Sequence, residues 1–274
     1  MAGRRLGHLM GHALLIVIGI IWIYPFIWMV SSSLKSNLGF YSLNLLPKAL
    51  HFDNYSRAWN GAHFSIYFFN TAVITFGTVI MVLILCSLTG YAIGRVNFPG
   101  RRVVVVFIAA LMFVPKGYTV IPLFELVRHL GLNNTLLGII FAEASGAHVL
   151  FILMFAAYFR GIPKELEDAA AIDGCGFIRT FALVMLPTAR PIIATTGVMQ
   201  FIWSWNSFLI PLVLTISSPN LRTLAVGTFS FVGNYQTDYT AMAAAATISI
   251  VPIIIVFIVA QRQFMEGVAG AVKQ

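Results

Sequence analysis

The chain has 274 residues, of which 59% are hydrophobic and only 9% are charged, and its mean hydropathy is +0.89. Soluble globular proteins carry about 25% charged residues, so this composition excludes a soluble protein and indicates an integral membrane protein. The net charge of +8 is compatible with a nucleic-acid partner, and the positions of the basic residues, described below, decide whether one is expected. Cys86 lies in an apolar run and Cys175 in a polar segment; this difference in expected depth argues against a disulfide.

Six long apolar runs predict six transmembrane helices in an all-α membrane protein, because a spanning helix needs about 20 mainly apolar residues. We expect the spans at residues 13–34, 70–93, 103–123, 136–159, 191–216 and 239–260 of a single transmembrane domain that covers residues 1–274. The first run is longer than the apolar part of a typical secretory signal, and no small-x-small cleavage site follows it. It is therefore expected to remain as a span.

The positions of the basic residues predict the orientation in the membrane. Eleven lysines and arginines fall in the N-terminus, the turn 95–102, the loop 160–190 and the C-terminal tail, against six in or near the other connections. Because Lys and Arg are enriched in cytoplasmic loops, both termini and the loop 160–190 are expected in the cytoplasm. The excess charge then serves membrane insertion and contacts lipid headgroups, so a nucleic-acid partner is not expected.

The polar loop 160–190 predicts a short helix with an acidic start. It contains four of the nine acidic residues of the chain: Glu165, Glu167, Asp168 and Asp173. Carboxylates are favoured near the positive end of the helix dipole, and the following residues 169–171 are alanines, which are strong helix formers. Gly174 and Gly176 are expected to end the helix, because glycine readily adopts the left-handed conformation found at helix ends.

Asp168-Ala169-Ala170, Gly174, Val184 and Leu186-Pro187 resemble the EAA loop of permease subunits in ATP-driven (ABC) importers. The spacing matches throughout, and one position differs, since Asp168 stands where the motif has glutamate. The resemblance implies a type I ABC importer permease fold with a cytoplasmic EAA coupling helix that the ATPase grips. The alternative is an ordinary amphipathic loop helix. The residues that the resemblance assigns to ATPase coupling are Glu165, Glu167, Asp168, Ala169, Ala170, Asp173, Gly174, Leu186 and Pro187.

Two further segments, Tyr91–Arg102 and Trp205–Leu212, are similar to carbohydrate-type ABC permeases, closest to the smaller six-span permease of maltose-type importers. This resemblance implies import of a sugar or oligosaccharide delivered by an extracytoplasmic binding protein. It also implies a second permease subunit in a heterodimer, two ATPase subunits, and a bacterial or archaeal inner membrane as the location.

The sequence shows no catalytic or metal-binding motif of its own. No G-x-x-x-x-G-K-[ST] phosphate loop occurs, so the chain is not expected to bind ATP by that route. We therefore expect a transport subunit that is not an enzyme and binds no cofactor. ATP and Mg²⁺ are expected on the partner ATPase.

A few polar and aromatic residues within the spans are candidates for the substrate pathway. Glu143 and Asn206 are expected roughly 24 Å and 22 Å from the cytoplasmic ends of their spans, where they could line one cavity. Trp203 and Trp205 could stack on a sugar ring. Alternatively, Glu143 makes a structural hydrogen bond or is exposed at the interface, and the tryptophans anchor the bilayer interface. His148 is expected on a different helix face from Glu143.

Two segments outside the spans have open alternatives. Ser217–Asp238 is expected either to face the binding protein or to be a solvated loop, and the tail Gln261–Gln274 either to touch the ATPase pair or to be disordered. The competing function is a stand-alone secondary transporter driven by an ion gradient. Such transporters usually show inverted repeats and ion-coordinating groups at the midplane, and neither is evident here.

Overall fold

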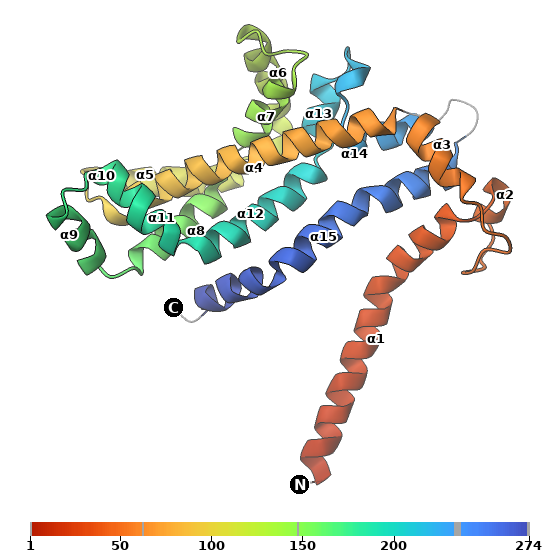
Figure 1. Cartoon of the computed structure of the whole chain (residues 1–274), viewed down its shortest axis with the longest axis horizontal. Coiled ribbons are helices and arrows are strands. Elements are labelled where there is room, and N and C mark those ends of the chain that lie inside the picture. Colours follow the sequence, from red (N-terminus) through yellow and green to blue (C-terminus); the bar gives the residue numbers. More distant parts are fainter. Residues whose placement is uncertain (1, 62, 147, 233–236, 273–274) are drawn as a thin grey trace. The chain divides into compact units, whose positions relative to one another are not determined.

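The computed structural model describes residues 2–61, 63–146, 148–232 and 237–272, and the regular elements formed by these residues are helices (Figure 1). An isolated β-bridge joins Val232 and Thr237. The residue contacts divide the chain into two compact units. Unit 1 comprises Met1–Ser65 and Gly227–Val251, and unit 2 comprises Ile66–Val226 and Pro252–Gln274.

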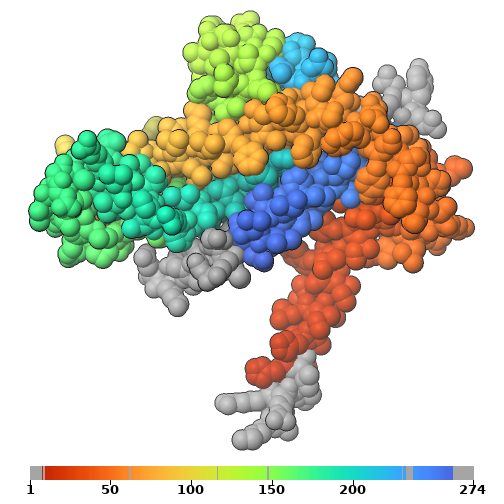
Figure 2. Space-filling model, in the orientation of Figure 1, coloured from red at the N-terminus to blue at the C-terminus, as the bar shows by residue number. Residues whose placement is uncertain are grey.

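Unit 1 contains the first helix, α1 (Ala2–Ser33), which is long and strongly apolar. The stretch Met10–Ser33 is long and apolar enough to cross a membrane, and none of its most apolar part is buried within the chain (Figure 2). Apolar side chains exposed over such a length have no stable place in water. They fit the hydrocarbon core of a bilayer.

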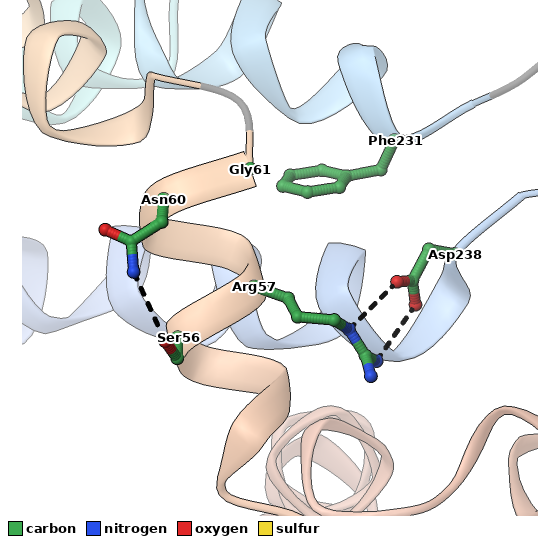
Figure 3. A pocket seen from close by; sticks show the side chains of 6 residues that line it. All are labelled: Ser56, Arg57, Asn60, Gly61, Phe231 and Asp238. Atoms are coloured by element: carbon green, nitrogen blue, oxygen red, sulfur yellow. Dashed lines mark hydrogen bonds and ion pairs between the residues drawn. The ribbon is translucent and has the colours of Figure 1, made fainter.

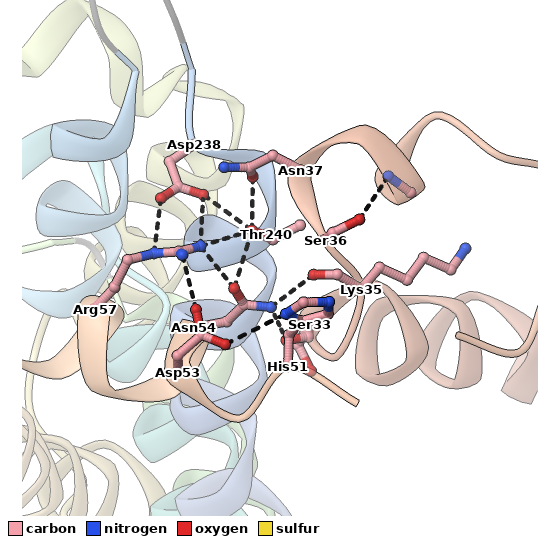
Figure 4. Close-up of polar contacts among 11 residues, drawn as sticks. Ser33, Lys35, Ser36, Asn37, His51, Asp53, Asn54, Arg57, Asp238 and Thr240 are labelled. Carbon is pink, nitrogen blue, oxygen red and sulfur yellow. Dashed lines mark hydrogen bonds and ion pairs between the residues drawn. The ribbon is translucent and has the colours of Figure 1, made fainter. Parts of the chain in front are cut away.

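A buried polar cluster ends α1 and ties it to α3 (Asp53–Gly61), as Figure 4 shows. The short helix α2 (Asn37–Phe40) lies between them in the chain. The Asn54 side chain, which is 1% exposed, donates hydrogen bonds of 2.8 Å to the backbone oxygens of both Ser33 and Lys35. Its own oxygen accepts a hydrogen bond of 2.6 Å from Arg57. One amide therefore satisfies two carbonyls left free at the end of α1.

The same cluster holds the start of α15 (Tyr239–Val272), the last helix. Asp238 caps this helix, because its carboxylate accepts a 3.0 Å hydrogen bond from the Ala241 amide. It also forms an ion pair with Arg57, whose Nε lies 3.3 Å from Asp238 Oδ2. The Thr240 hydroxyl, which is buried, lies 2.7 Å from Asn37 Oδ1.

In unit 2, α4 (Phe64–Arg95) packs closely on α8 (Val149–Arg160) through two glycines one turn apart. A Cβ placed on Gly90 would collide with Phe155 Cβ, and one on Gly94 would lie 2.8 Å from the Ala156 carbonyl oxygen. Small residues at this spacing let two helix backbones approach, as is common inside membranes. The buried core around this contact comprises Val82, Cys86, Tyr91, Ala144, Phe151, Phe155, Phe159, Phe181, Met185, Ala189 and Ile192.

Three of the expected spans are not single straight helices. By length and composition, Met10–Ser33, Phe64–Arg95 and Tyr239–Gln261 are unbroken candidate spans. Three more are bent pairs, which gives up to six candidate spans if each pair counts as one. The pairs are Arg101–Phe113 with Gly117–His129, bent by 95°, Leu136–Ala144 with Val149–Arg160, bent by 60°, and Phe177–Thr188 with Arg190–Trp205, bent by 80°.

The breaks coincide with residues that interrupt a helix. The expected span 103–123 is divided at Pro115, between α5 (Arg101–Ala110) and α6 (Val120–His129), with two short 3₁₀ turns. Proline has no amide hydrogen to continue the ladder. The expected span 191–216 is likewise two helices, α12 (Arg190–Trp205) and α13 (Leu209–Leu214), and Pro211 lies in the first turn of the second.

Away from the loop 160–190 in unit 2, α13 packs against α6 and α7 (Leu136–Ala144) (Figures 1 and 2). The link between α6 and α7 is fixed by Thr135, which caps α7 by accepting a 3.0 Å hydrogen bond from the Gly138 amide. Gly138 has no room for a side chain, since an added Cβ would collide with the Leu132 carbonyl oxygen. After α13 the chain continues into α14 (Leu224–Thr228).

Candidate functional site

The acidic segment of the loop 160–190 forms a helix, α9 (Glu165–Ile172), with a well-defined end. Gly174 has φ +76°, in the left-handed region. Its amide donates to the Ala171 carbonyl at 3.1 Å, and the Cys175 amide donates to the Ala170 carbonyl at 2.9 Å. These two bonds form a Schellman motif, which satisfies the last carbonyls of a helix.

Gly176 was expected to help end the same helix, but it has a different role. Its backbone is extended, with φ −78° and ψ 172°, and it precedes the next helix, α10 (Phe177–Thr180). Gly174 alone provides the left-handed turn between these two short helices. The two helices and the cytoplasmic ends predicted for α4 and α5 gather at one end of unit 2 (Figure 1).

The alanine stretch of α9 does not present one uniform small-residue face. Ala169 is exposed, whereas Ala170 is buried at 5% exposure, and it faces the rest of unit 2. The exposed surface also carries the carboxylates of Glu165, Asp168 and Asp173. Beside them, Ile172 is 88% exposed. The exposed side of α9 is therefore acidic and also carries the apolar Ile172 side chain.

Glu167 is the acidic residue of α9 that turns inward. The Tyr91 hydroxyl donates a 3.0 Å hydrogen bond to Glu167 Oε1, and Arg95 Nε donates a 2.8 Å hydrogen bond to Oε2. Arg95 Nη2 also lies 2.6 Å from Oε2, and the two charged side chains are only 11% and 19% exposed. We call these three residues, Tyr91, Arg95 and Glu167, the α4–α9 node.

The sequence did not single out Tyr91 or Arg95 as site residues. Tyr91 lies within the segment that resembles other permeases, and Arg95 lies in that segment and among the basic residues of the turn 95–102. They lie four residues apart and therefore on one face of α4. A tyrosine and an arginine four residues apart at the end of a span, together with an acidic helix elsewhere in the chain, are the signal in the sequence for the contact with Glu167.

The C-terminal half of the loop turns a corner into α12. After α10 comes a π-helical turn, Phe181–Met185, then the short α11 (Leu186–Thr188). Pro187 lies in α11, and the chain bends by 80° between Thr188 and Arg190. Proline removes a backbone donor, and π-helical turns are frequent at functional sites. Leu186 and Pro187 are thus part of the corner rather than of α9.

Glu143, near the end of α7, accepts a hydrogen bond from the hydroxyl of Ser207. Ser207 follows Asn206 in the break between α12 and α13. The structure therefore brings Glu143 next to the 206–207 region. The Asn206 side chain itself donates to the Ile202 carbonyl of its own helix at 2.8 Å.

The two candidate tryptophans differ in their surroundings. Trp203 is exposed on one side and stacks on Phe151, with ring centroids 5.0 Å apart. Trp205 is buried, and it stacks on Phe201 at 5.3 Å and meets the edge of Phe68 at 5.6 Å. In this conformation Trp205 is a packing residue, and Trp203 is the one with an accessible ring.

His148 lies closer to Glu143 than helical spacing suggested. Its Nε2 is 3.3 Å from the backbone oxygen of Glu143, and its ring stacks on Phe151. The expectation that these residues lie on different faces assumed one continuous helix. The chain instead bends by 60° between α7 and α8, which returns His148 to the end of α7.

In unit 1, a surface pocket of about 500 Å³ lies beside α3 (Figure 3). Its lining comprises Ser56, Arg57, Asn60, Gly61, Phe231 and Asp238. Phe231 and Asp238 come from the segment Ser217–Asp238, so part of this segment is packed against α3 and is not simply solvated. Residues 233–236 of the segment lie outside the described residues.

The described residues contain no group of three or more His, Cys, Asp or Glu side chains placed to hold a metal ion. For the C-terminal tail, the sequence leaves open a disordered end or a contact with the ATPase pair. Its backbone continues α15 as far as Val272. The side chains of residues 262–272 and all of residues 273–274 lie outside what the structure describes.

Taken together, these features define an all-helical integral membrane protein of the permease class. Residues 87–269 match the family described as binding-protein-dependent transport system inner membrane component, and the chain belongs to this family. Permeases of this family act in ABC importers together with ATPase and binding-protein partners. The family membership gives no support to the alternative of a stand-alone secondary transporter.

Individual relatives agree over nearly the whole chain. The chain is 34% identical to the diacetylchitobiose uptake system permease protein NgcG of Streptomyces coelicolor, over 96% of this chain and 86% of the relative. It is 33% identical to the probable starch degradation products transport system permease protein AmyC of Thermoanaerobacterium thermosulfurigenes, over 94% of each.

A solved structure confirms the fold. The chain superposes with a TM-score of 0.83 and 28% identity on a chain in the crystal structure of a bacterial ABC transporter involved in the import of the acidic polysaccharide alginate. The match covers 96% of this chain and 98% of that one. The type I ABC importer permease fold expected from the sequence is therefore confirmed.

Proposed function

We propose that this chain is one of two permease subunits, in a heterodimer, that together form the translocation pathway for a sugar or oligosaccharide. The named substrates of its relatives, diacetylchitobiose and starch degradation products, are both carbohydrates and support this class. The whole chain then acts as one transmembrane domain. A binding protein on the outer side delivers the substrate.

The observation that carries this proposal is the form of α9. A short helix with two exposed carboxylates, a third at its C-cap and a defined end is attached to α8 on one side. On the other side it is attached to α12 through α10 and the π-helical turn. A partner that moves α9 would therefore move both membrane helices. We assign α9 as the coupling helix that a pair of ATPase subunits grips on the cytoplasmic side.

The energy comes from outside this chain. ATP and Mg²⁺ bind to the ATPase subunits, and this chain contributes no residue to hydrolysis. Glu165, Asp168 and Asp173 provide the charged contacts with the ATPase, and Ala169 allows close approach of the two surfaces. Glu167 has a different role, because its carboxylate is occupied within this chain.

The substrate pathway in unit 2 passes the region of Glu143, Trp203 and Asn206. Trp203 offers a partly exposed ring face on which the apolar face of a sugar can pack. Glu143 and its partner Ser207 supply hydrogen-bonding groups near the break between α12 and α13. Trp205 supports this region by packing and does not contact the sugar.

Cross-linking between α9 and the ATPase tests the proposal. Ala169→Cys is introduced after Cys86 and Cys175 have been replaced, and the complex is isolated from the native membrane. Because Ala169 is exposed on the acidic surface, we expect a cross-link from position 169 to a nucleotide-hydrolysing subunit.

Ala170→Cys is the matched control. It lies one residue away on the same helix but is buried, so its cross-linking yield should be much lower. If neither position ever captures an ATPase, or if both positions react equally, α9 does not have the assigned role.

A further inference from the structure

The α4–α9 node joins a helix outside the loop 160–190 directly to α9. Its side chains come from positions 72 and 76 residues apart in the sequence. Both carboxylate oxygens of Glu167 are engaged, one by Tyr91 and the other by Arg95. Charge-assisted hydrogen bonds of this length are among the stronger polar contacts in proteins, and salt screens a partly buried pair less than an exposed one.

Arg95 links α9 to a third element, the end of α8. Its Nη1 donates a 2.9 Å hydrogen bond to the Ile162 carbonyl and a 3.4 Å one to the Phe159 carbonyl. These carbonyls lie at the C-terminal end of α8, where the helix dipole favours a cation. One guanidinium therefore binds both the segment that leads out of α8, through two carbonyls, and α9 itself, through Glu167.

Tyr91 contacts the other half of the loop. Its ring stacks on Phe177 at 4.8 Å and on Phe181 at 5.3 Å, while its hydroxyl donates to Glu167. The end of α4 thus contacts α9, α10 and the π-helical turn together. On the same part of α4, Gly90 and Gly94 pack so closely against α8 that neither position has room for a Cβ.

We infer that the α4–α9 node makes α4 part of the moving body, so that displacement of α9 is passed to α4 directly as well as along the chain to α8 and α12. Tyr91, Arg95 and Glu167 act as positioning residues for coupling. This inference rests on the proposed role of α9 as the coupling helix. It separates the acidic residues of the loop into an outward set for the partner and one inward residue that holds α9 to its own subunit.

Distances between paired spin labels test the inference in the full complex, with Cys86 and Cys175 replaced. Labels at Val96→Cys, directly after α4, and Ile172→Cys, on α9, report on the node. Labels at Ile172→Cys and Ile216→Cys report on movement across unit 2. Both pairs are measured without nucleotide and after trapping with ATP and vanadate.

With the native node, we expect the 172–216 distance to differ between the two states and the 96–172 distance to stay the same. In Arg95→Met and Glu167→Gln, the 96–172 distance should shift between the two states. Arg102→Met is the control: it removes an exposed arginine in the first turn of α5, outside the node. This variant should behave as the native chain does. Tyr91→Phe, which keeps the ring and removes the hydroxyl, should give a smaller shift.

A 96–172 distance that already changes in the native chain overturns the inference, and this measurement needs no substitution in the node. A distance that stays fixed in both Arg95→Met and Glu167→Gln, in complexes that elute intact on size exclusion, overturns it as well. A 172–216 distance that never changes, or failure of Ala169→Cys to capture an ATPase, counts instead against the proposed function of α9.

Discussion

At the scale of single residues, the polar side chains of this protein are divided between anchoring and contact. Asn54 and Glu167 are each surrounded by donors or acceptors of the same unit. Asp168, the residue that matches the EAA pattern, is exposed. Neighbouring carboxylates on one short helix thus have different tasks because the helix turns by about 100° from one residue to the next.

Asn54 provides a direct test of an anchoring role. Asn54→Ala removes the donors to the Ser33 and Lys35 carbonyls and leaves those buried groups without them. We expect a loss of about 1–3 kcal/mol in the free energy of unfolding, which corresponds to about 2–4 °C in Tm for each kcal/mol. Thermal unfolding of the purified complex in detergent measures it.

Asn60→Ala is the control, since Asn60 is exposed on the same helix and its amide donates to the exposed Ser56 hydroxyl at 3.2 Å. Its effect should remain within about 0.5 kcal/mol. Equal losses in the two variants would show that the buried cluster in Figure 4 does not stabilise unit 1.

At the scale of elements, the contact between α4 and α8 is set by small residues. A Cβ added to Gly90 would lie only 3.0 Å from the Ile152 carbonyl oxygen and 3.0 Å from the Ala156 amide nitrogen. Such backbone atoms cannot move aside without separating the helices. The node at the end of α4 depends on this approach, because Arg95 reaches the carbonyls at the end of α8.

We therefore expect Gly90→Ala to destabilise unit 2 by about 1–3 kcal/mol, as overpacking of a tight core does. Gly197→Ala is the matched comparison within α12, because its Cβ would meet only Leu83 Cδ1 at 3.6 Å, an ordinary contact. That variant should be neutral or more stable by up to about 1 kcal/mol, since alanine is the better helix former. Thermal unfolding in detergent distinguishes the two, and a larger loss at Gly197 would contradict the packing described for α4 and α8.

At the scale of the whole molecule, the proposed function requires α9 and the connection between α1 and α3 to face opposite sides of the membrane. Ile172, on α9, is strongly exposed, and so is Leu43, between α2 and α3. Both side chains are exposed within this chain, so their replacement by cysteine removes no packing inside either unit. They can therefore be labelled without disturbing either unit.

A membrane-impermeant maleimide should label Leu43→Cys in intact cells and Ile172→Cys only in inside-out vesicles, with Cys86 and Cys175 replaced. The excess of basic residues in the turn 95–102 and the loop 160–190 is the physical reason for this orientation. Labelling of position 172 from outside the cell would rule out contact between α9 and a cytoplasmic ATPase.

The sequence by itself determined the features that depend on local chemistry. Composition indicated a membrane protein, the apolar runs located the candidate spans, and the EAA pattern led to the family that residues 87–269 confirm. The end of α9 at Gly174 was also predictable, because a left-handed turn is a property of the residue that adopts it. All these signals lie within short windows of the chain.

Only the tertiary structure decided which side of each helix faces inward. In the tertiary structure Ala170 is buried and Ala169 is exposed, and Glu167 pairs with Arg95. The expected span 191–216 is interrupted between α12 and α13, where Ser207 donates a hydrogen bond to Glu143. Each outcome depends on the rotation of one helix against another, and that rotation is set by packing between residues far apart in the sequence. An apolar run fixes the length of a span, but the neighbouring helices fix its bends and its contacts.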